Sequence, residues 1–128
     1  MPIKPRIERY ELIEEITKLV ARRGTCLRAT VGCVIEKDGR PLSWGYNGSP
    51  PGEPHCIDVG CEMVGGHCVR TTHAEINAIA WAAKQGICID GARMFVYGWD
   101  QGICHACEKA AKSAGIKFIF CIEKKAGE

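Results

Sequence analysis

Catalytic chemistry is suggested most strongly in this 128-residue chain by four residues, His73, Glu75, Cys104 and Cys107. One imidazole and two thiolates are the nitrogen and sulfur set that holds a catalytic zinc while a fourth tetrahedral position stays open for water. The Cys-x-x-Cys spacing at a helix start also lets both sulfurs reach one ion. The sequence therefore predicts a metal site with a titratable carboxylate beside it.

Glu75 has two interpretations. It follows Thr72 by three residues, which is the spacing of a helix capping box, in which the carboxylate accepts a hydrogen bond from the Thr72 N–H. Alternatively, Glu75 takes a proton from water on the metal, whose pKa the metal has lowered toward neutrality. The presence of His73 and of the two cysteines favours the catalytic interpretation.

The Cys104-x-x-Cys107 motif is also compatible with a redox dithiol or with a structural zinc knuckle. A redox pair has no use for a separate His73 and Glu75, so metal ligation is favoured. His105, inside the motif, is expected to be exposed on the helix. Both halves of the site fall at predicted helix starts, where unpaired N–H groups stabilise thiolates, so we expect ionised sulfurs.

The segments that must position these residues alternate between helical and extended patterns. Apolar residues recur at helical spacing over residues 7–23, 72–86 and 105–114. Apolar, β-branched runs predict strands over residues 30–35, 41–46, 93–98 and 117–122, with a tight turn at Asp38-Gly39 joining the first two. The last run is almost wholly apolar and is expected in the sheet's interior. The order α-β-β-α-β-α-β predicts an α/β sandwich.

Composition and charge narrow the class of protein. With 46% hydrophobic and 25% charged residues, the chain is expected to form one domain over residues 1–128, with a loose tail at about 124–128. A net charge of +2, with Lys and Arg spread along the chain, does not favour nucleic acid as a partner. Residues 1–10 are too charged for an export signal and no run approaches a membrane span, so we expect a cytoplasmic protein.

These motifs resemble those of the zinc-dependent cytidine deaminase superfamily, in which HAE is followed by a downstream CxxC. Three runs look like those of deoxycytidylate (dCMP) deaminases: TCLR at residues 25–28, GYNGSPPG at 45–52 and CVRTTHAEINAI at 68–79. The similarity covers about residues 7–122. It implies a cytidine-deaminase-like α/β/α sandwich, with a mixed sheet of about four to five strands and helices on both faces.

The resemblance also implies how the metal site works. His73, Cys104 and Cys107 would bind the catalytic zinc, and the zinc hydroxide would attack C4 of a cytosine. Glu75 would relay the proton to the ring and then to the leaving ammonia.

Three substrate contacts follow from the same resemblance. Asn47 would orient the nucleoside sugar, the backbone of Ala74 would hydrogen-bond to the ring edge, and Arg28 would contact a phosphate. The residues alone leave alternatives open, because Asn47-Gly48 is also a turn sequence and an arginine such as Arg28 is often simply solvated.

A second, structural zinc is the further expectation. Nine cysteines, an odd count, favour metal ligation over a disulfide scaffold. Related sequences carry Cys or His around a Gly/Pro-rich loop, here about residues 47–71, and a zinc would supply the folding energy that its few large apolar residues cannot. The expected ligands are Cys26, Cys56, Cys61 and Cys68, with His55 or His67 able to replace one. Alternatively they are ordinary buried thiols, as we expect Cys33, Cys88 and Cys121 to be.

The resemblance thus implies a zinc-dependent hydrolytic deaminase acting on a cytosine nucleotide, with dCMP to dUMP as the expected reaction, and a dimer or hexamer as the expected assembly. Two departures from the family pattern leave alternatives open: Ile103 replaces the usual proline before the CxxC, and the loop of residues 97–103 is longer and contains Trp99. One alternative is a deaminase of another base or nucleotide form, namely a modified pyrimidine nucleotide, a nucleoside or adenosine in RNA. The other is a non-catalytic zinc-binding member of the fold.

Overall fold

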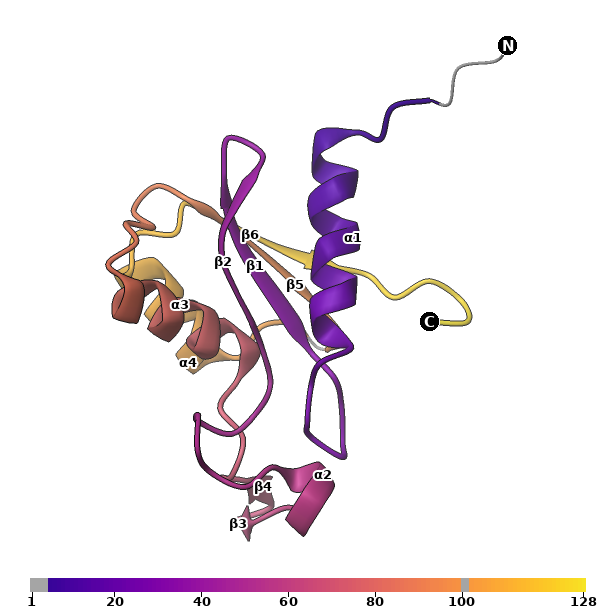
Figure 1. Cartoon of the computed structure of the whole chain (residues 1–128), viewed down its shortest axis with the longest axis vertical. Coiled ribbons are helices and arrows are strands. Elements are labelled where there is room, and N and C mark those ends of the chain that lie inside the picture. The colour runs from indigo at the N-terminus through magenta and orange to yellow at the C-terminus, as the bar shows by residue number, and fades with distance from the viewer. Residues whose placement is uncertain (1–4, 100–101) are drawn as a thin grey trace.

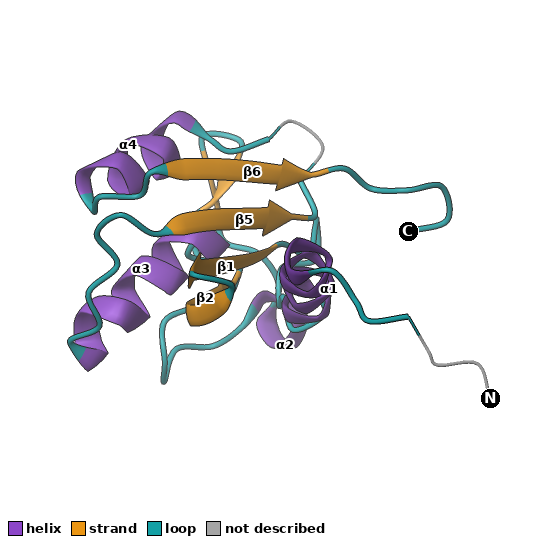
Figure 2. Cartoon of the chain, turned by 90° about the horizontal axis from the view of Figure 1, so that it is seen from above, coloured by secondary structure: helices purple, strands orange, loops and turns teal. Residues whose placement is uncertain are grey.

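A four-stranded mixed sheet forms the centre of the computed structural model, which describes residues 5–99 and 102–128. The strands are β1 (Gly32–Lys37), β2 (Arg40–Tyr46), β5 (Arg93–Tyr97) and β6 (Phe118–Ile122), in the order β2-β1-β5-β6 (Figure 2). β1 is antiparallel to both of its neighbours, whereas β5 and β6 are parallel. The predicted mixed sheet is confirmed, with four strands.

Helices cover both faces of this sheet (Figure 1). The first helix, α1 (Arg9–Ala21), lies on one face, and α3 (Ala74–Gln85) and α4 (His105–Ser113) lie on the other. Neighbouring residues of β1 belong to two different apolar clusters, one on each face of the sheet. Val34 packs with Ile13 of α1, whereas Cys33 packs with Ala78 of α3. This alternation confirms the α/β/α sandwich. Among the described residues, none of the helices combines the length and apolar character that crossing a membrane requires.

The long loop after β2 is more structured than predicted. It contains a short helix, α2 (Cys56–Val59), and a two-stranded hairpin of β3 (Met63–Val64) and β4 (His67–Cys68). We call residues 50–71 the small lobe. Figure 1 shows it beyond one end of the main sheet, on the side where α3 begins.

The prediction that β6 lies in the interior of the sheet is wrong. It is the edge strand of the sheet, and Phe118 and Phe120 are 52% and 43% exposed. The reason is that α1 packs mainly against β1, β2 and β5, so it leaves the same face of β6 largely open. In the tail beyond β6, Glu128 forms an ion pair of 3.1 Å with Lys18 of α1.

The position of α3 on the sheet depends on Gly45 in β2. A Cβ atom at this position would lie 2.5 Å from the backbone N of Ala78 and 2.6 Å from the carbonyl oxygen of Ala74. Any side chain would therefore push the α3 backbone away from β2. Gly45 allows α3 to start close to the end of β2, and both places carry predicted site residues.

Candidate active site

The predicted ligand triad comes from the starts of two helices that pack against each other. His73 is the N-cap residue of α3, Cys104 is the N-cap residue of α4, and Cys107 lies in the first turn of α4. His73 Nδ1 lies 3.5 Å from Cys104 Sγ and 3.3 Å from Cys107 Sγ. The structure thus brings His73 together with two cysteines that follow it by 31 and 34 positions in the sequence.

These separations fit a zinc ion. Zinc bonds of about 2.0–2.1 Å to nitrogen and 2.3 Å to sulfur place two tetrahedral ligands roughly 3.6 Å apart. The ligand atoms of His73, Cys104 and Cys107 all lie within 4.8 Å of one another, with Nδ1 as the histidine atom that faces both sulfurs. Three protein ligands leave the fourth position for water or substrate, as in catalytic zinc sites.

The two sulfurs have different surroundings. The backbone N–H of Cys107 donates to Cys104 Sγ over 3.4 Å, so Cys104 caps α4 as the helix-start argument predicts. Cys107 is buried, and burial raises the pKa of its thiol well above the usual range, with the Glu75 carboxylate and Cys104 adding to the effect. Burial of Cys107 thus opposes the ionisation that a helix start favours, and a bound dication would displace the thiol proton.

Glu75 does not serve as a capping residue. α3 starts one position later than predicted, with His73 and not Thr72 as its N-cap, and the cap receives no side-chain hydrogen bond. Glu75 is the second helical residue and is only 4% exposed, yet its side chain lines a cavity. The capping-box interpretation is therefore wrong, and the carboxylate is available for chemistry in that cavity.

The cavity has a volume of about 460 Å³ and connects His73 and Cys104 of the metal triad with all three predicted substrate-binding residues, whereas Cys107 is buried and is not part of the lining. Its lining includes Arg28, Asn47 and Ala74 as well as Glu75. Trp99 also lines it and is half exposed, whereas Asp100 and Gln101 of the same loop lie outside the described residues. A volume of this size suits a small-molecule ligand.

Asn47 is anchored in the wall of the cavity rather than in a tight turn. Its Oδ1 accepts a hydrogen bond of 2.8 Å from the backbone N–H of Val31, and its Nδ2 donates one of 2.7 Å to the carbonyl of Ala29. Neither Asn47 nor Gly48 has a positive φ, so they do not form the Asn-Gly turn that the sequence also allowed. One N–H of the amide stays available for a ligand.

The sequence is that of a known enzyme family. The chain matches the family described as "Cytidine and deoxycytidylate deaminase zinc-binding region" over residues 7–123. It belongs to this deaminase family.

Members of the deaminase family that are similar in sequence to this chain include proteins of a bacterium and of a phage. ComE operon protein 2 of Bacillus subtilis is 45% identical over 105 residues, which cover 82% of this chain and 54% of the relative. The deoxycytidylate deaminase of Enterobacteria phage T4 is 34% identical over 84% of this chain and 74% of its own length. The chain thus spans about half of the first relative and about three quarters of the second.

Among solved structures, the dCMP deaminase of cyanophage S-TIM5 in complex with dCMP and dUMP superposes with a TM-score of 0.76. The two chains are 29% identical, and the match covers 91% of this chain and 82% of that one. The similarity confirms the deaminase fold. Together with the family match, it supports zinc as the metal of the triad.

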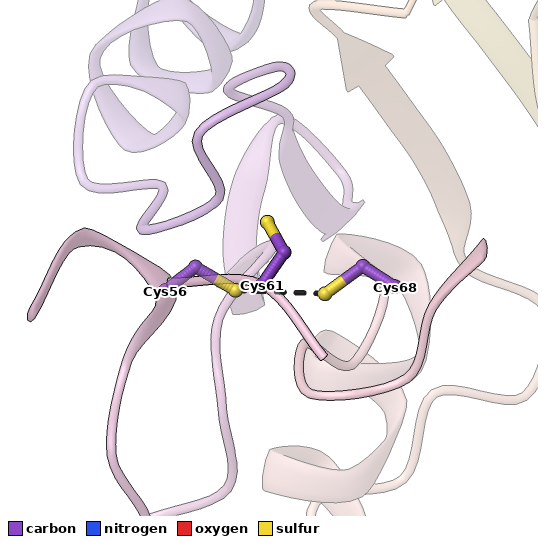
Figure 3. Close-up of side chains that lie close together, drawn as sticks. All are labelled: Cys56, Cys61 and Cys68. Atoms are coloured by element: carbon purple, nitrogen blue, oxygen red, sulfur yellow. Dashed lines mark hydrogen bonds between the residues drawn. The ribbon is translucent and has the colours of Figure 1, made fainter. Parts of the chain in front are cut away.

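A second group of possible metal ligands lies in the small lobe of this deaminase-family chain. The Sγ atoms of Cys56, Cys61 and Cys68 lie within 4.8 Å of one another, and Cys56 and Cys68 are 3.6 Å apart (Figure 3). Tetrahedral zinc separates two thiolates by roughly 3.8 Å, so three sulfurs fit. Burial raises the pKa of Cys56, whereas hydrogen bonds from backbone N–H groups, first that of Arg70, lower the pKa of Cys68.

The other cysteines differ in part from the predictions. Cys26 lies outside the three-sulfur group, although it lines the same cavity as Cys68, and its Sγ accepts a hydrogen bond from the Arg28 N–H. Cys33 is buried as predicted, but Cys88 and Cys121 are exposed. Both lie outside the apolar clusters, Cys88 between α3 and β5 and Cys121 on the edge strand β6.

Three residues of the cavity wall were not singled out as active-site residues from the sequence. His67 and Thr71 line the cavity from the small lobe, next to Cys68 and just before His73, and His105 lines it from α4. His105 is exposed, as predicted. His67 and Thr71 lie close in sequence to the predicted metal ligands Cys68 and His73. That closeness is the signal that could have identified them, because neighbours of a ligand often line the same site.

Proposed function

We propose that this chain catalyses the zinc-dependent hydrolytic deamination of a cytosine nucleotide, with dCMP to dUMP as its reaction. The observation that carries the proposal is one cavity that joins His73 and Cys104 of the metal triad with the Glu75 carboxylate and the three substrate-contact residues. The reaction cleaves an exocyclic C–N bond of the base, and water supplies the oxygen that replaces ammonia.

The metal triad and the carboxylate would divide the chemistry between them. His73, Cys104 and Cys107 would hold a zinc ion, which supplies Lewis-acid activation of water when bound. Glu75, buried beside the triad, would accept the proton of that water and deliver it to the ring nitrogen and then to the leaving amine.

The remaining residues would hold the nucleotide. The free amide N–H of Asn47 would donate to a sugar hydroxyl, and the backbone of Ala74, at the first position of α3, would contact the ring edge. Arg28 is exposed in the cavity wall, where its guanidinium would pair with a phosphate. A deoxycytidylate substrate agrees with the names of the phage relatives, which are deoxycytidylate deaminases.

A second zinc in the small lobe is part of the proposal. Cys56, Cys61 and Cys68 would supply three sulfurs, and Cys26 would complete the shell through a movement of its own side chain toward them. The support is that this lobe has few large buried side chains, since its apolar residues Ile57, Val59, Met63 and Val64 are all more than half exposed. A metal would supply the order that apolar packing does not.

The setting of the reaction is proposed as a cytoplasmic homo-oligomer, either a dimer or a hexamer. Nine cysteines that form no disulfide suit a reducing compartment. Large exposed aromatic residues, Trp44, Trp81, Phe118 and Phe120, are typical of surfaces that other copies cover.

A test of the reaction is ammonia release by the zinc-loaded protein with dCMP, deoxycytidine, dCTP, 5-methyl-dCMP and an adenosine-containing RNA hairpin. We expect the highest kcat/KM for dCMP. A higher value for another compound would replace the substrate, and no turnover of any of them would identify a non-catalytic member of the family. The Glu75→Gln protein is the control for background hydrolysis.

A further inference from the structure

Asn77 lies in α3, one turn after His73, and its side-chain amide is bonded to three backbone carbonyls. Nδ2 donates to the carbonyl oxygens of Tyr46 over 2.8 Å, Thr72 over 3.2 Å and Gly48 over 3.3 Å. An amide NH₂ has two hydrogens, so at least one of them is shared between two acceptors. One side chain therefore joins three separate backbone groups.

The three carbonyls are informative because of the residues next to them. Tyr46 and Gly48 are the residues on either side of Asn47, and Thr72 directly precedes His73. Gly48 and Thr72 are also paired with each other, with backbone N–H···O=C bonds of 3.2 and 2.9 Å in the two directions. Asn77 thus binds the backbone on both sides of Asn47, at Tyr46 and Gly48. It also binds the backbone of Thr72, the residue before the histidine ligand.

We propose that Asn77 is a positioning residue that fixes the metal ligand His73 and the cavity residue Asn47 relative to each other. Asn77 itself is absent from the lining of the cavity, so it acts through backbone atoms. The part of this proposal that concerns Asn47 rests on the proposed function, which makes Asn47 a substrate contact. The part that concerns His73 depends only on the metal triad. Loss of the amide donors would loosen both at once.

Ser43 provides a matched control. It lies in β2, its Oγ donates to the carbonyl of Ala78 in α3 over 2.7 Å, and it is buried. Ser43→Ala therefore removes a side-chain hydrogen bond between β2 and α3, the two elements that Asn77 also joins through Tyr46. Its acceptor, Ala78, directly follows Asn77 in the sequence. That bond touches neither the residue before His73 nor those around Asn47, so it reports on general packing of α3 against the sheet.

The main variant is Asn77→Asp, which keeps the shape but replaces the donor NH₂ by an oxygen that faces three carbonyls. Asn77→Ser keeps one donor and is the milder second variant. The first readout is the rate at which the purified holoprotein releases zinc to the chelator 4-(2-pyridylazo)resorcinol. The release phase that is missing in Cys107→Ala belongs to the triad. The second readout is the dissociation constant of dUMP, measured by calorimetry, and thermal unfolding shows which variants are folded.

We expect Asn77→Asp to release the triad zinc about tenfold faster and to bind dUMP about tenfold more weakly, the low end for loss of a group that orients a metal ligand. Asn77→Ser should fall between it and the native protein, and Ser43→Ala should stay within about twofold on both readouts. Native release rates in a folded Asn77→Asp or Asn77→Ser protein would overturn the proposal. An equal effect of Ser43→Ala would overturn it too, by assigning the loss to packing.

The two readouts separate this proposal from the proposed function. If the native protein does not bind dUMP, the function fails, and the zinc release rates still decide whether Asn77 positions the ligand. If the native protein binds dUMP and turns over dCMP while Asn77→Asp keeps both native zinc release and native dUMP affinity, only the positioning role fails.

Discussion

Glu75→Gln tests the catalytic role of this carboxylate against a structural one. The substitution keeps size and shape and removes the group that can accept a proton. General acid and base groups contribute about 10²- to 10⁴-fold to turnover, so we expect kcat for dCMP to fall by at least about a hundredfold. Zinc content should stay unchanged, because none of the three ligands is altered.

The structure also predicts what Glu75→Gln does to stability. Glu75 makes no cap hydrogen bond, and among residues 5–99 and 102–128 it has no ion pair, although it is 4% exposed. Its favourable interaction with the start of α3 is worth about 0.3–1 kcal/mol, and its carboxylate also lies close enough to the Cys107 thiol to raise the pKa of that group. The melting temperature of the metal-free variant should therefore fall by no more than about 4 °C, the shift that corresponds to roughly 1 kcal/mol.

The assay compares the native protein with Glu75→Gln and with Glu108→Gln. Glu108 is in the first turn of α4, where its exposed carboxylate pairs with Lys112 at 3.0 Å. Glu108→Gln should lose a little stability and keep full turnover, the opposite pattern. Turnover of Glu75→Gln within tenfold of the native rate, or a melting temperature that drops together with zinc content, would show that the carboxylate is structural.

Three further predictions concern packing, the second metal and the substrate. Gly45→Ala should lower the free energy of unfolding in urea by roughly 2 kcal/mol or more, because its Cβ would lie 2.5 Å from the α3 backbone. A decrease under about 0.5 kcal/mol would mean that α3 shifts freely. Cys68→Ser should remove one zinc equivalent by elemental analysis and Cys26→Ser should lower zinc retention less, because only Cys68 belongs to the preassembled sulfur group; equal losses would contradict that order. Arg28→Ala should lower kcat/KM for dCMP about tenfold to a hundredfold and leave that for deoxycytidine unchanged; parallel losses would exclude a phosphate contact.

The catalytic centre was the most predictable part of the molecule. His73, Cys104 and Cys107 are chemically unusual residue types at characteristic spacings, and the helix starts beside them follow from local patterns. The start of α3 was predicted one residue early, because Thr72 is a better capping residue by type than His73, which is the N-cap in the structure. The backbone of Thr72 is instead paired with that of Gly48, which keeps Thr72 outside the helix.

Other features could not be read from local patterns because they depend on distant neighbours. The apolar run of β6 is typical of an interior strand, but its burial depends on which element covers it, and α1 does not. Asn77 was missed as well, since an asparagine within a helix has no role that sequence periodicity reveals. An asparagine one turn after the predicted ligand His73 is nevertheless a weak signal, because asparagine side chains that are not solvated usually form specific hydrogen bonds.

The chain direction of the sheet explains why the site forms at one end. α4 connects the parallel strands β5 and β6, so it must start where β5 ends, and α3 must run opposite to β5 in order to precede it. Both helices therefore begin at the carboxyl end of β5, and β2, antiparallel to β1, also ends there, directly before Asn47. Two helix starts thus place their N–H groups at one site, where that of Cys107 donates to Cys104 Sγ, while burial of the Cys107 thiol opposes its ionisation until a dication binds. The fold thus supplies the electrostatic setting, while the reaction depends on a few side chains at these ends, which is why Glu75→Gln should abolish turnover without unfolding the protein.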